Sequence, residues 1–157
     1  MNEFLQAASE LVSVKEVLFY MRNVCTRMPF KYGVATLTSV PILHAEMTIE
    51  SADGTVGVGV SADILPPKWF DKDPSKDYRH NVHDLLFVAR SAADAFLGSS
   101  RSPRTMFEIW QDGYAATLAA GDSRALNHLT SSHGSTLMER ALIDAIGRLK
   151  GLSYHEM

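Results

Sequence analysis

The sequence predicts an α+β domain in which a three-stranded antiparallel meander is followed by a three- to four-helix bundle. Apolar and polar residues alternate with period two before residue 63, and apolar residues recur at helical spacing after residue 77. An Asp-Gly pair at residues 53 and 54 is a strong signal for a tight hairpin turn between two strands. The chain of 157 residues, 46% of them hydrophobic, is long enough to bury the core of one such domain.

Three strands are expected in the first part of the chain. The first covers residues 14–21, which are rich in valine and aromatic side chains, and the second covers residues 42–51, where apolar and polar residues alternate. The third strand covers residues 55–62. Its Gly57 and Gly59 leave bare backbone, so we expect another element to pack closely against this strand.

Two loops are expected beside the meander. Residues 23–33 are predicted to be a loop because Pro29 lacks the N–H group that a strand ladder needs. Residues 63–75 contain three prolines and a cluster of charges, so they cannot form regular structure. This second loop is unusually apolar for a connection, with Trp69 and Phe70 adjacent to each other.

The second part of the chain is predicted to be helical. The expected helices cover residues 77–97, residues 102–121, a short stretch over residues 123–129, and residues 134–150. Ser102 followed by Pro103 indicates the start of one helix, and Ser135 is interpreted as the N-cap of the last helix.

Composition and charge exclude several classes of partner. A formal net charge of -3 gives no reason to expect nucleic acid or an anionic membrane surface as a partner. The longest apolar runs are a few residues, whereas about 20 are needed to cross a bilayer. The single cysteine, Cys25, cannot form an internal disulfide and fits a reducing compartment, so we expect a cytoplasmic location.

Three short motifs follow one another in a meaningful order. Pro29-Phe30 comes after the first strand, Asp53-Gly54 is followed by Gly57-Val58-Gly59, and the last predicted helix contains residues 136–148, TLMERALIDAIGR. In their order and spacing these motifs resemble the N-terminal capping domain of the enolase superfamily, in its mandelate racemase and muconate-lactonizing branch. The resemblance spans about residues 14–151. It implies an enolase N-terminal domain-like fold.

The resemblance also implies what lies outside this domain. Residues 1–13 would be an N-terminal extension, and residues 152–157 would be a tail leading to a catalytic (β/α)₈ barrel. Such a barrel needs about 200 residues or more, so it is missing from this chain. In the family the barrel carries the Lys or His base and the Mg²⁺ ligands of an isomerase or lyase that acts on carboxylates. The chain alone is therefore expected to hold no cofactor and to be inactive.

In the family two loops of the capping domain close over the barrel mouth and select the substrate. By position these loops would be residues 25–32 and 61–70. The residues implied to contact substrate are Met28, Phe30, Lys31, Tyr32, Lys68 and Trp69. The alternative for Trp69 is that its ring only pins the long loop to the core. The individual sequence of residues 66–77 leaves the substrate class and the reaction subclass open.

Three readings of function follow. The first is a capping and specificity domain whose partner is the barrel of the same protein. The second is a free-standing binding or interaction module with this fold, and the third is an unrelated α+β enzyme. For the first reading we also expect a homo-oligomer, because a cap without its barrel exposes apolar surface.

Overall fold

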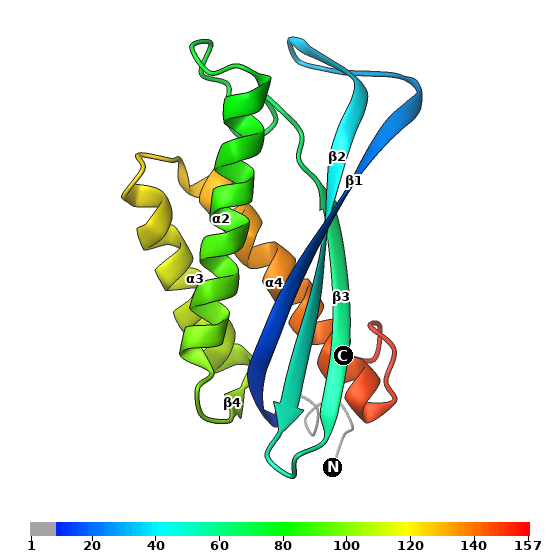
Figure 1. The fold of residues 1–157 in the computed structure, drawn as a ribbon, viewed down its shortest axis with the longest axis vertical. Coiled ribbons are helices and arrows are strands. Elements are labelled where there is room, and N and C mark those ends of the chain that lie inside the picture. The colour runs from blue at the N-terminus through cyan, green and yellow to red at the C-terminus, as the bar shows by residue number, and fades with distance from the viewer. Residues whose placement is uncertain (1–8) are drawn as a thin grey trace.

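The computed structural model describes residues 9–157, which form an α+β fold with a sheet packed against helices (Figure 1). The sheet is antiparallel, with four strands in the order β3-β2-β1-β4, and three helices lie on one side of it, two of them against the sheet and the third packed on those two. The elements are β1 (Leu11–Tyr32), β2 (Ala35–Ser51), β3 (Val56–Ile64), α2 (Tyr78–Ser99), β4 (Arg104–Thr105), α3 (Met106–Asp122) and α4 (His128–Lys150). The predicted meander followed by helices is therefore confirmed.

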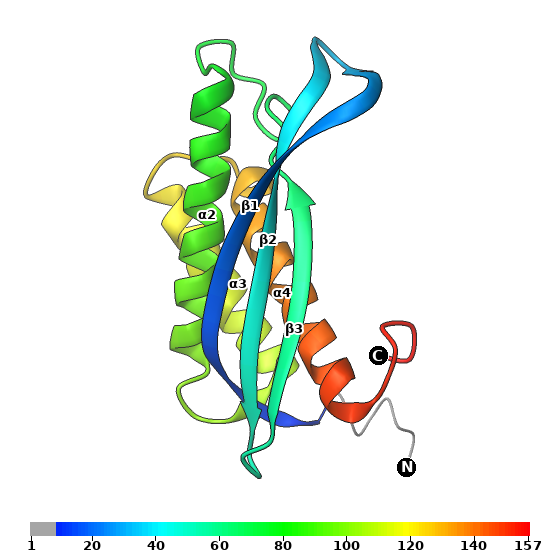
Figure 2. The ribbon, with the colours of Figure 1, turned by 45° about the vertical axis from the view of Figure 1, so that its right-hand side comes forward.

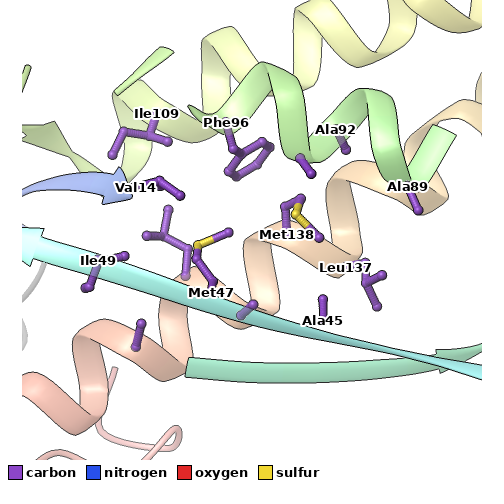
Figure 3. Close-up of a cluster of buried hydrophobic side chains, with 14 of the residues drawn as sticks. Val14, Ala45, Met47, Ile49, Ala89, Ala92, Phe96, Ile109, Leu137 and Met138 are labelled. Atoms are coloured by element: carbon purple, nitrogen blue, oxygen red, sulfur yellow. The ribbon is translucent and has the colours of Figure 1, made fainter. Parts of the chain in front are cut away.

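The alternation in β2 decides which face of the sheet is buried. Leu43, Ala45, Met47 and Ile49 are buried beneath the helices, while the residues between them lie half-buried on the opposite face. Met47 from β2, Phe96 from α2 and Met138 from α4 point into one core (Figure 3). The apolar face that the sequence indicates is thus the face on which the helices pack.

The first hairpin is longer than expected, and the prediction of a loop over residues 23–33 is wrong. β1 continues to Tyr32, and the chain turns at Gly33, whose φ of 53° is left-handed, before β2 begins at Ala35. β3 pairs with β2 only as far as Ile42, so beyond that point β1 and β2 pair only with each other. We call residues 23–41 the arm, which extends past the rest of the sheet in both views (Figures 1 and 2).

A bulge explains how the arm accommodates Pro29. The register passes from Cys25 opposite Ser39 to Phe30 opposite Leu37, so residues 26–29 oppose only Thr38. A bulge is a place where a strand can hold a residue that donates no ladder hydrogen bond. Pro29 therefore interrupts the pairing locally without ending the strand.

Helix α4 packs directly on β3, as the two glycines predict. A Cβ atom added at Gly59 would lie 2.2 Å from the Ala141 carbonyl oxygen and 2.2 Å from the Ala145 nitrogen. Side chains of α4 also cover the outer edge of β3. Asp144 accepts a 2.8 Å hydrogen bond from the N–H of Val60, which would otherwise face solvent.

Two helix starts differ from the expectation. The second helix has Thr105 as its N-cap, in a capping box with Glu108, and does not begin at Ser102. The last helix begins at His128 with Asn127 as its N-cap, and the short helix expected over residues 123–129 is not formed. Ser135 is buried inside α4, where its hydroxyl donates to the carbonyl of Ser132 at 3.0 Å.

The ends of the described chain belong to the domain. β1 begins at Leu11, inside the range of residues 1–13 expected to be an extension, and Val12 is fully buried. Part of that range, residues 1–8, lies outside the described residues. At the other end Gly151 ends α4 with a φ of 69°, and Leu152 and Met157 pack back against the core.

Candidate functional site

The end of the arm meets the connection between β3 and α2, which we call the 65–77 loop. The Tyr32 hydroxyl donates a 2.7 Å hydrogen bond to the carbonyl oxygen of Pro67. The rings of Tyr32 and Trp69 meet edge to face, with centroids 5.1 Å apart, and the ring of Phe30 lies 5.7 Å from that of Tyr32. Phe30, Tyr32 and Trp69 therefore form a continuous aromatic row across two segments distant in sequence.

Two hollows adjoin the Tyr32–Trp69 pair. The larger, of about 400 Å³, is lined by Gly33, Val34, Lys68 and Lys72 as well as by the pair itself. The smaller, of about 280 Å³, is lined mainly by apolar residues and by one carboxylate, that of Asp63. Apolar walls with a few polar groups are typical of sites that bind small organic molecules.

Trp69 and Phe30 leave much of their rings open to a ligand. Trp69 is 49% exposed and Phe30 is 53% exposed, although both contact Tyr32. Aromatic side chains that are fixed on one side and exposed on the other can contribute contact area at little entropic cost. The aromatic row can therefore bind an apolar or ring-shaped group.

Lys68 is held inside the loop. Its φ is 60°, and its backbone N–H donates a 2.8 Å hydrogen bond to Oδ1 of Asn81 in α2. Its ammonium group donates to the backbone carbonyls of Asp73 and Lys76. The cation of Lys68 thus ties the loop together, while the exposed Lys72, which the sequence argument missed, lines the larger hollow.

Two of the sequence-derived candidates lie apart from the aromatic row. Met28 is 68% exposed in the bulge of the arm, and neither Met28 nor Lys31 lines either hollow. Successive residues of a strand point to opposite sides, so Lys31 points away from the side shared by Phe30 and Tyr32. The structure thus brings together Phe30, Tyr32, Lys68 and Trp69.

A network of charges holds the far end of the 65–77 loop. The ammonium of Lys76 lies 2.7 Å from the carboxylate of Asp71 and 2.9 Å from that of Asp84 in α2. These hydrogen bonds, first that to Asp71, raise the pKa of Lys76. The same contact with Lys76 lowers the pKa of Asp71. Lys76 and Asp71 are therefore both charged at neutral pH, and the contact of Lys76 with Asp84 ties the loop to α2.

The underside of the loop rests on His133 of α4. The rings of Phe70 and His133 are 5.0 Å apart, and the amide of Asn127 donates to the Phe70 carbonyl oxygen at 3.3 Å. His133 is only 4% exposed. Burial lowers the pKa of His133, with the Asp63 carboxylate opposing the shift and the Arg140 guanidinium adding to it. The imidazole is therefore neutral at pH 7.

Sequence reasoning missed the residues beneath the loop. Asn81 and His133 are polar residues within helical stretches, where a solvated position is the ordinary expectation. Their roles depend on the loop that covers them, and no local pattern indicates that contact. The only available signal was the unusual apolar content of the loop, which implies that it packs on something.

The described residues contain neither a group of metal ligands nor a membrane-spanning helix. Within residues 9–157, no three His, Cys, Asp or Glu side chains are grouped as metal ligands would be. No helix in that part of the chain is long and apolar enough to span a membrane.

Comparison with known proteins identifies the fold. No protein-family model and no curated protein matches the chain. A mandelate racemase/muconate lactonizing enzyme-like protein from Rubrobacter xylanophilus has a structure that aligns with 90% of this chain, at a TM-score of 0.56 and 19% identity. The L-talarate/galactarate dehydratase from Salmonella typhimurium LT2 aligns with 95% of it, at a TM-score of 0.52 and 18% identity. The chain has the fold of one part of these enzymes.

The extent of the match is as informative as its quality. The chain spans 32% of the Rubrobacter protein and 33% of the Salmonella dehydratase. An enolase from Bradyrhizobium, solved with magnesium and mandelic acid, aligns in the same way, with 90% of this chain matched to 33% of the enzyme at a TM-score of 0.50 and 13% identity. The resemblance to the capping domain predicted from the sequence is therefore confirmed at the level of the fold.

Proposed function

We propose that this chain is the capping domain of an enolase-superfamily, mandelate racemase-like enzyme that acts on a carboxylate substrate. The observation that carries the proposal is the meeting of the arm with the 65–77 loop through Tyr32, Pro67 and Trp69. Two segments far apart in sequence thereby present one continuous surface of exposed rings, flanked by two hollows. Such a surface is suited to cover a substrate bound in a second domain.

In this proposal the chain supplies binding and exclusion of water, and the barrel supplies the chemistry. The base that would remove the proton beside the carboxylate, and the Mg²⁺ that would supply electrostatic stabilisation there, would both belong to the barrel. The aromatic row contacts the part of the substrate distant from that carboxylate. A closed lid strengthens the electrostatic interactions beneath it and keeps water from the reacting atoms. The enzyme would be an isomerase or lyase, and we propose a cytoplasmic location for it.

The distal part of the substrate would be recognised by shape and by a few charges. Phe30 and Trp69 offer apolar rings, and Lys72 lines the larger hollow with a cation whose charge could attract a second anionic group. Asp63 lines the smaller hollow and is already paired with Arg140 at 2.8 Å. A substrate with an apolar or ring-shaped body fits this arrangement better than a compact, uniformly polar one.

The test combines the chain with the barrel encoded in the same reading frame or beside it. Mg²⁺-dependent exchange of the proton next to the carboxylate, followed by proton NMR in deuterium oxide, is measured over a panel of acids that differ only in their distal groups. We expect the chain to raise the rate and to narrow the range of acids accepted. Trp69→Ala should widen that range again, whereas Phe107→Ala, which removes an exposed ring from α3, should not.

Two results would contradict the proposal. One is the absence of any encoded barrel with a base and carboxylate ligands. The other is a barrel whose rate and choice of acids do not change when the chain is added. Either result would favour a free-standing binding module built on the same fold.

A further inference from the structure

Three buried polar atoms beneath the 65–77 loop lack hydrogen-bond partners. Among the described residues, the buried side-chain atoms without a partner are Nδ2 of Asn81, Oγ1 of Thr130 and Nε2 of His133. Asn81 is 4% exposed and Thr130 is 2% exposed. Leaving a buried polar group unpaired destabilises the fold, so such groups normally have a partner, often an ordered water.

Two of the three residues that carry these atoms line one small cavity. Asn81 and Thr130 line a space of about 10 Å³, together with Phe70 of the loop and the carboxylates of Asp71 and Asp84. About 10–15 Å³, measured in this way, holds a single water molecule. The cavity lies where α2, α4 and the loop meet, which is also where the structure leaves polar groups unsatisfied.

The orientation of Asn81 determines which chemistry the cavity needs. Its Oδ1 accepts from the backbone N–H of Lys68, which can only donate, so Nδ2 must be the atom on the other side of the amide. Nδ2 is a donor and requires an acceptor. The Thr130 hydroxyl can donate or accept, and the Asp71 and Asp84 carboxylates only accept. The occupant must therefore both accept and donate hydrogen bonds.

Only a small neutral molecule meets these requirements. A cation would face the N–H groups of Asn81 and the nearby ammonium of Lys76, which already pairs with both carboxylates. An anion would face those carboxylates. We propose that one buried water occupies this cavity, accepting from Asn81 Nδ2, bonding to Thr130 Oγ1 and donating to the carboxylates.

The bound water would position the loop. Asn81 would then be fixed on one side by the N–H of Lys68 and on the other by the water, which links it to α4 through Thr130. Lys68 immediately precedes Trp69, so these contacts would fix the position of the Trp69 ring relative to the helices. The inference concerns the isolated chain and does not depend on the proposed function. The third unpartnered atom, in His133, does not line this cavity.

The test detects the water in the purified chain by NMR. Cross-relaxation between water and the side-chain amide protons of Asn81 is measured in the unaltered protein, in Thr130→Ser and in Thr130→Val. In the unaltered protein and in Thr130→Ser we expect cross-relaxation of the sign that marks a long-lived bound water, because serine keeps the hydroxyl. The signal should disappear in Thr130→Val, and exchange of the Lys68 amide proton should become about tenfold faster.

Three outcomes would overturn the proposal. The first is the absence of a long-lived water signal at Asn81 in the folded, unaltered protein, which decides the matter even if Thr130→Val fails to fold. The second is a signal in Thr130→Val as strong as that in Thr130→Ser. The third is a shift of the Asn81 amide resonances on titration with Na⁺, K⁺ or Mg²⁺, which would assign the cavity to a cation.

Discussion

The hydroxyl of Tyr32 donates to the carbonyl oxygen of Pro67, 35 residues further along the chain, and this bond joins the end of a strand to a proline-rich loop. The arm extends past the end of β3, and the 65–77 loop runs between β3 and α2 at the same end of the domain (Figure 2). Burial, and secondarily the nearby Tyr78, raises the pKa of Tyr32, so the phenol remains a neutral donor throughout the physiological range. The arm and the loop are therefore joined directly by a hydrogen bond whose donor keeps its proton.

We therefore predict that Tyr32→Phe loosens both segments together. The ring and its contacts with Phe30 and Trp69 remain, and the loss is one hydrogen bond, about 0.5–1.5 kcal/mol. Amide hydrogen exchange in the 65–77 loop should accelerate by up to about tenfold, while exchange in β2 and α4 should stay unchanged. Tyr20→Phe, which alters an exposed phenol on the same strand, is the control. Equal exchange in both variants would mean that the bond does not hold the loop.

Substitution by alanine should have opposite effects at a glycine packed against a helix, Gly59, and at an exposed glycine, Gly98. Gly59→Ala places a Cβ atom 2.2 Å from backbone atoms of α4, which cannot move aside without shifting the helix. We expect a loss of about 3 kcal/mol or more in the free energy of unfolding. Gly98→Ala, in an exposed turn of α2 with nothing within 4 Å, should instead stabilise by about 0.5–1 kcal/mol. Urea denaturation followed by circular dichroism measures both, and a neutral Gly59→Ala would contradict the close packing.

His133 predicts a loss of stability in mild acid. Burial lowers its pKa in the folded protein below the ordinary 6.5, so the unfolded chain binds the proton more readily. The contribution of His133 is therefore present above pH 6.5 and is lost as the pH falls from 6.5 toward the folded pKa. Over that interval the slope approaches about 1.4 kcal/mol per pH unit.

Substitution of His133 should flatten this pH dependence. Urea denaturation of His133→Gln between pH 7.5 and pH 5 should show a smaller decline than the unaltered chain, because glutamine does not titrate. His83→Gln, at an exposed position of α2, should keep the original slope. If all three proteins lose stability in parallel, the acid sensitivity comes from other groups and the burial of His133 plays no part in it.

The exposed apolar side chains of the arm and the 65–77 loop predict self-association of the chain. Val34 is 93% exposed, and Met28, Phe30 and Trp69 are each at least 49% exposed, all on the arm or the 65–77 loop. Apolar surface of this kind commonly finds a partner, most simply in a two-fold dimer. Light scattering at millimolar concentration should therefore show a mass of about twice 17.3 kDa. Trp69→Ser should weaken the dimer, and Phe107→Ser, which removes a still more exposed ring on α3, should not. A monomer at that concentration would reject the idea.

Part of this structure could be read from local patterns. Apolar and polar residues alternate along β2 because one face of the strand lies under the helices, so every second residue is apolar and buried. Gly57 and Gly59 indicated the approach of another element because only the absence of a side chain permits it. Both signals come from the core, where packing restricts the choice of residue.

The arm could not be read in the same way. Most of its residues are exposed on both faces, so no alternation marks them as strand, and Pro29 suggested an interruption. The start of α4 was hidden for a related reason. Residues 128–134 are mostly Ser, Thr, His and Gly, which are poor helix formers, and the helix there depends on burial against the rest of the fold. Both the strands of the arm and the start of α4 therefore depend on contacts with residues distant in sequence.

The self-contained pairing of the arm has a consequence for how this protein could evolve. Residues 23–41 hydrogen-bond mainly with each other and, apart from a few positions such as Leu37 and Val40, contribute little to the buried core. Mutations at Met28, Phe30 or Val34 are thus decoupled from the stability of the domain. A combinatorial library randomised at these three positions should retain the melting temperature of the parent in most members. Selection could then reshape what the surface recognises without first having to rescue the fold.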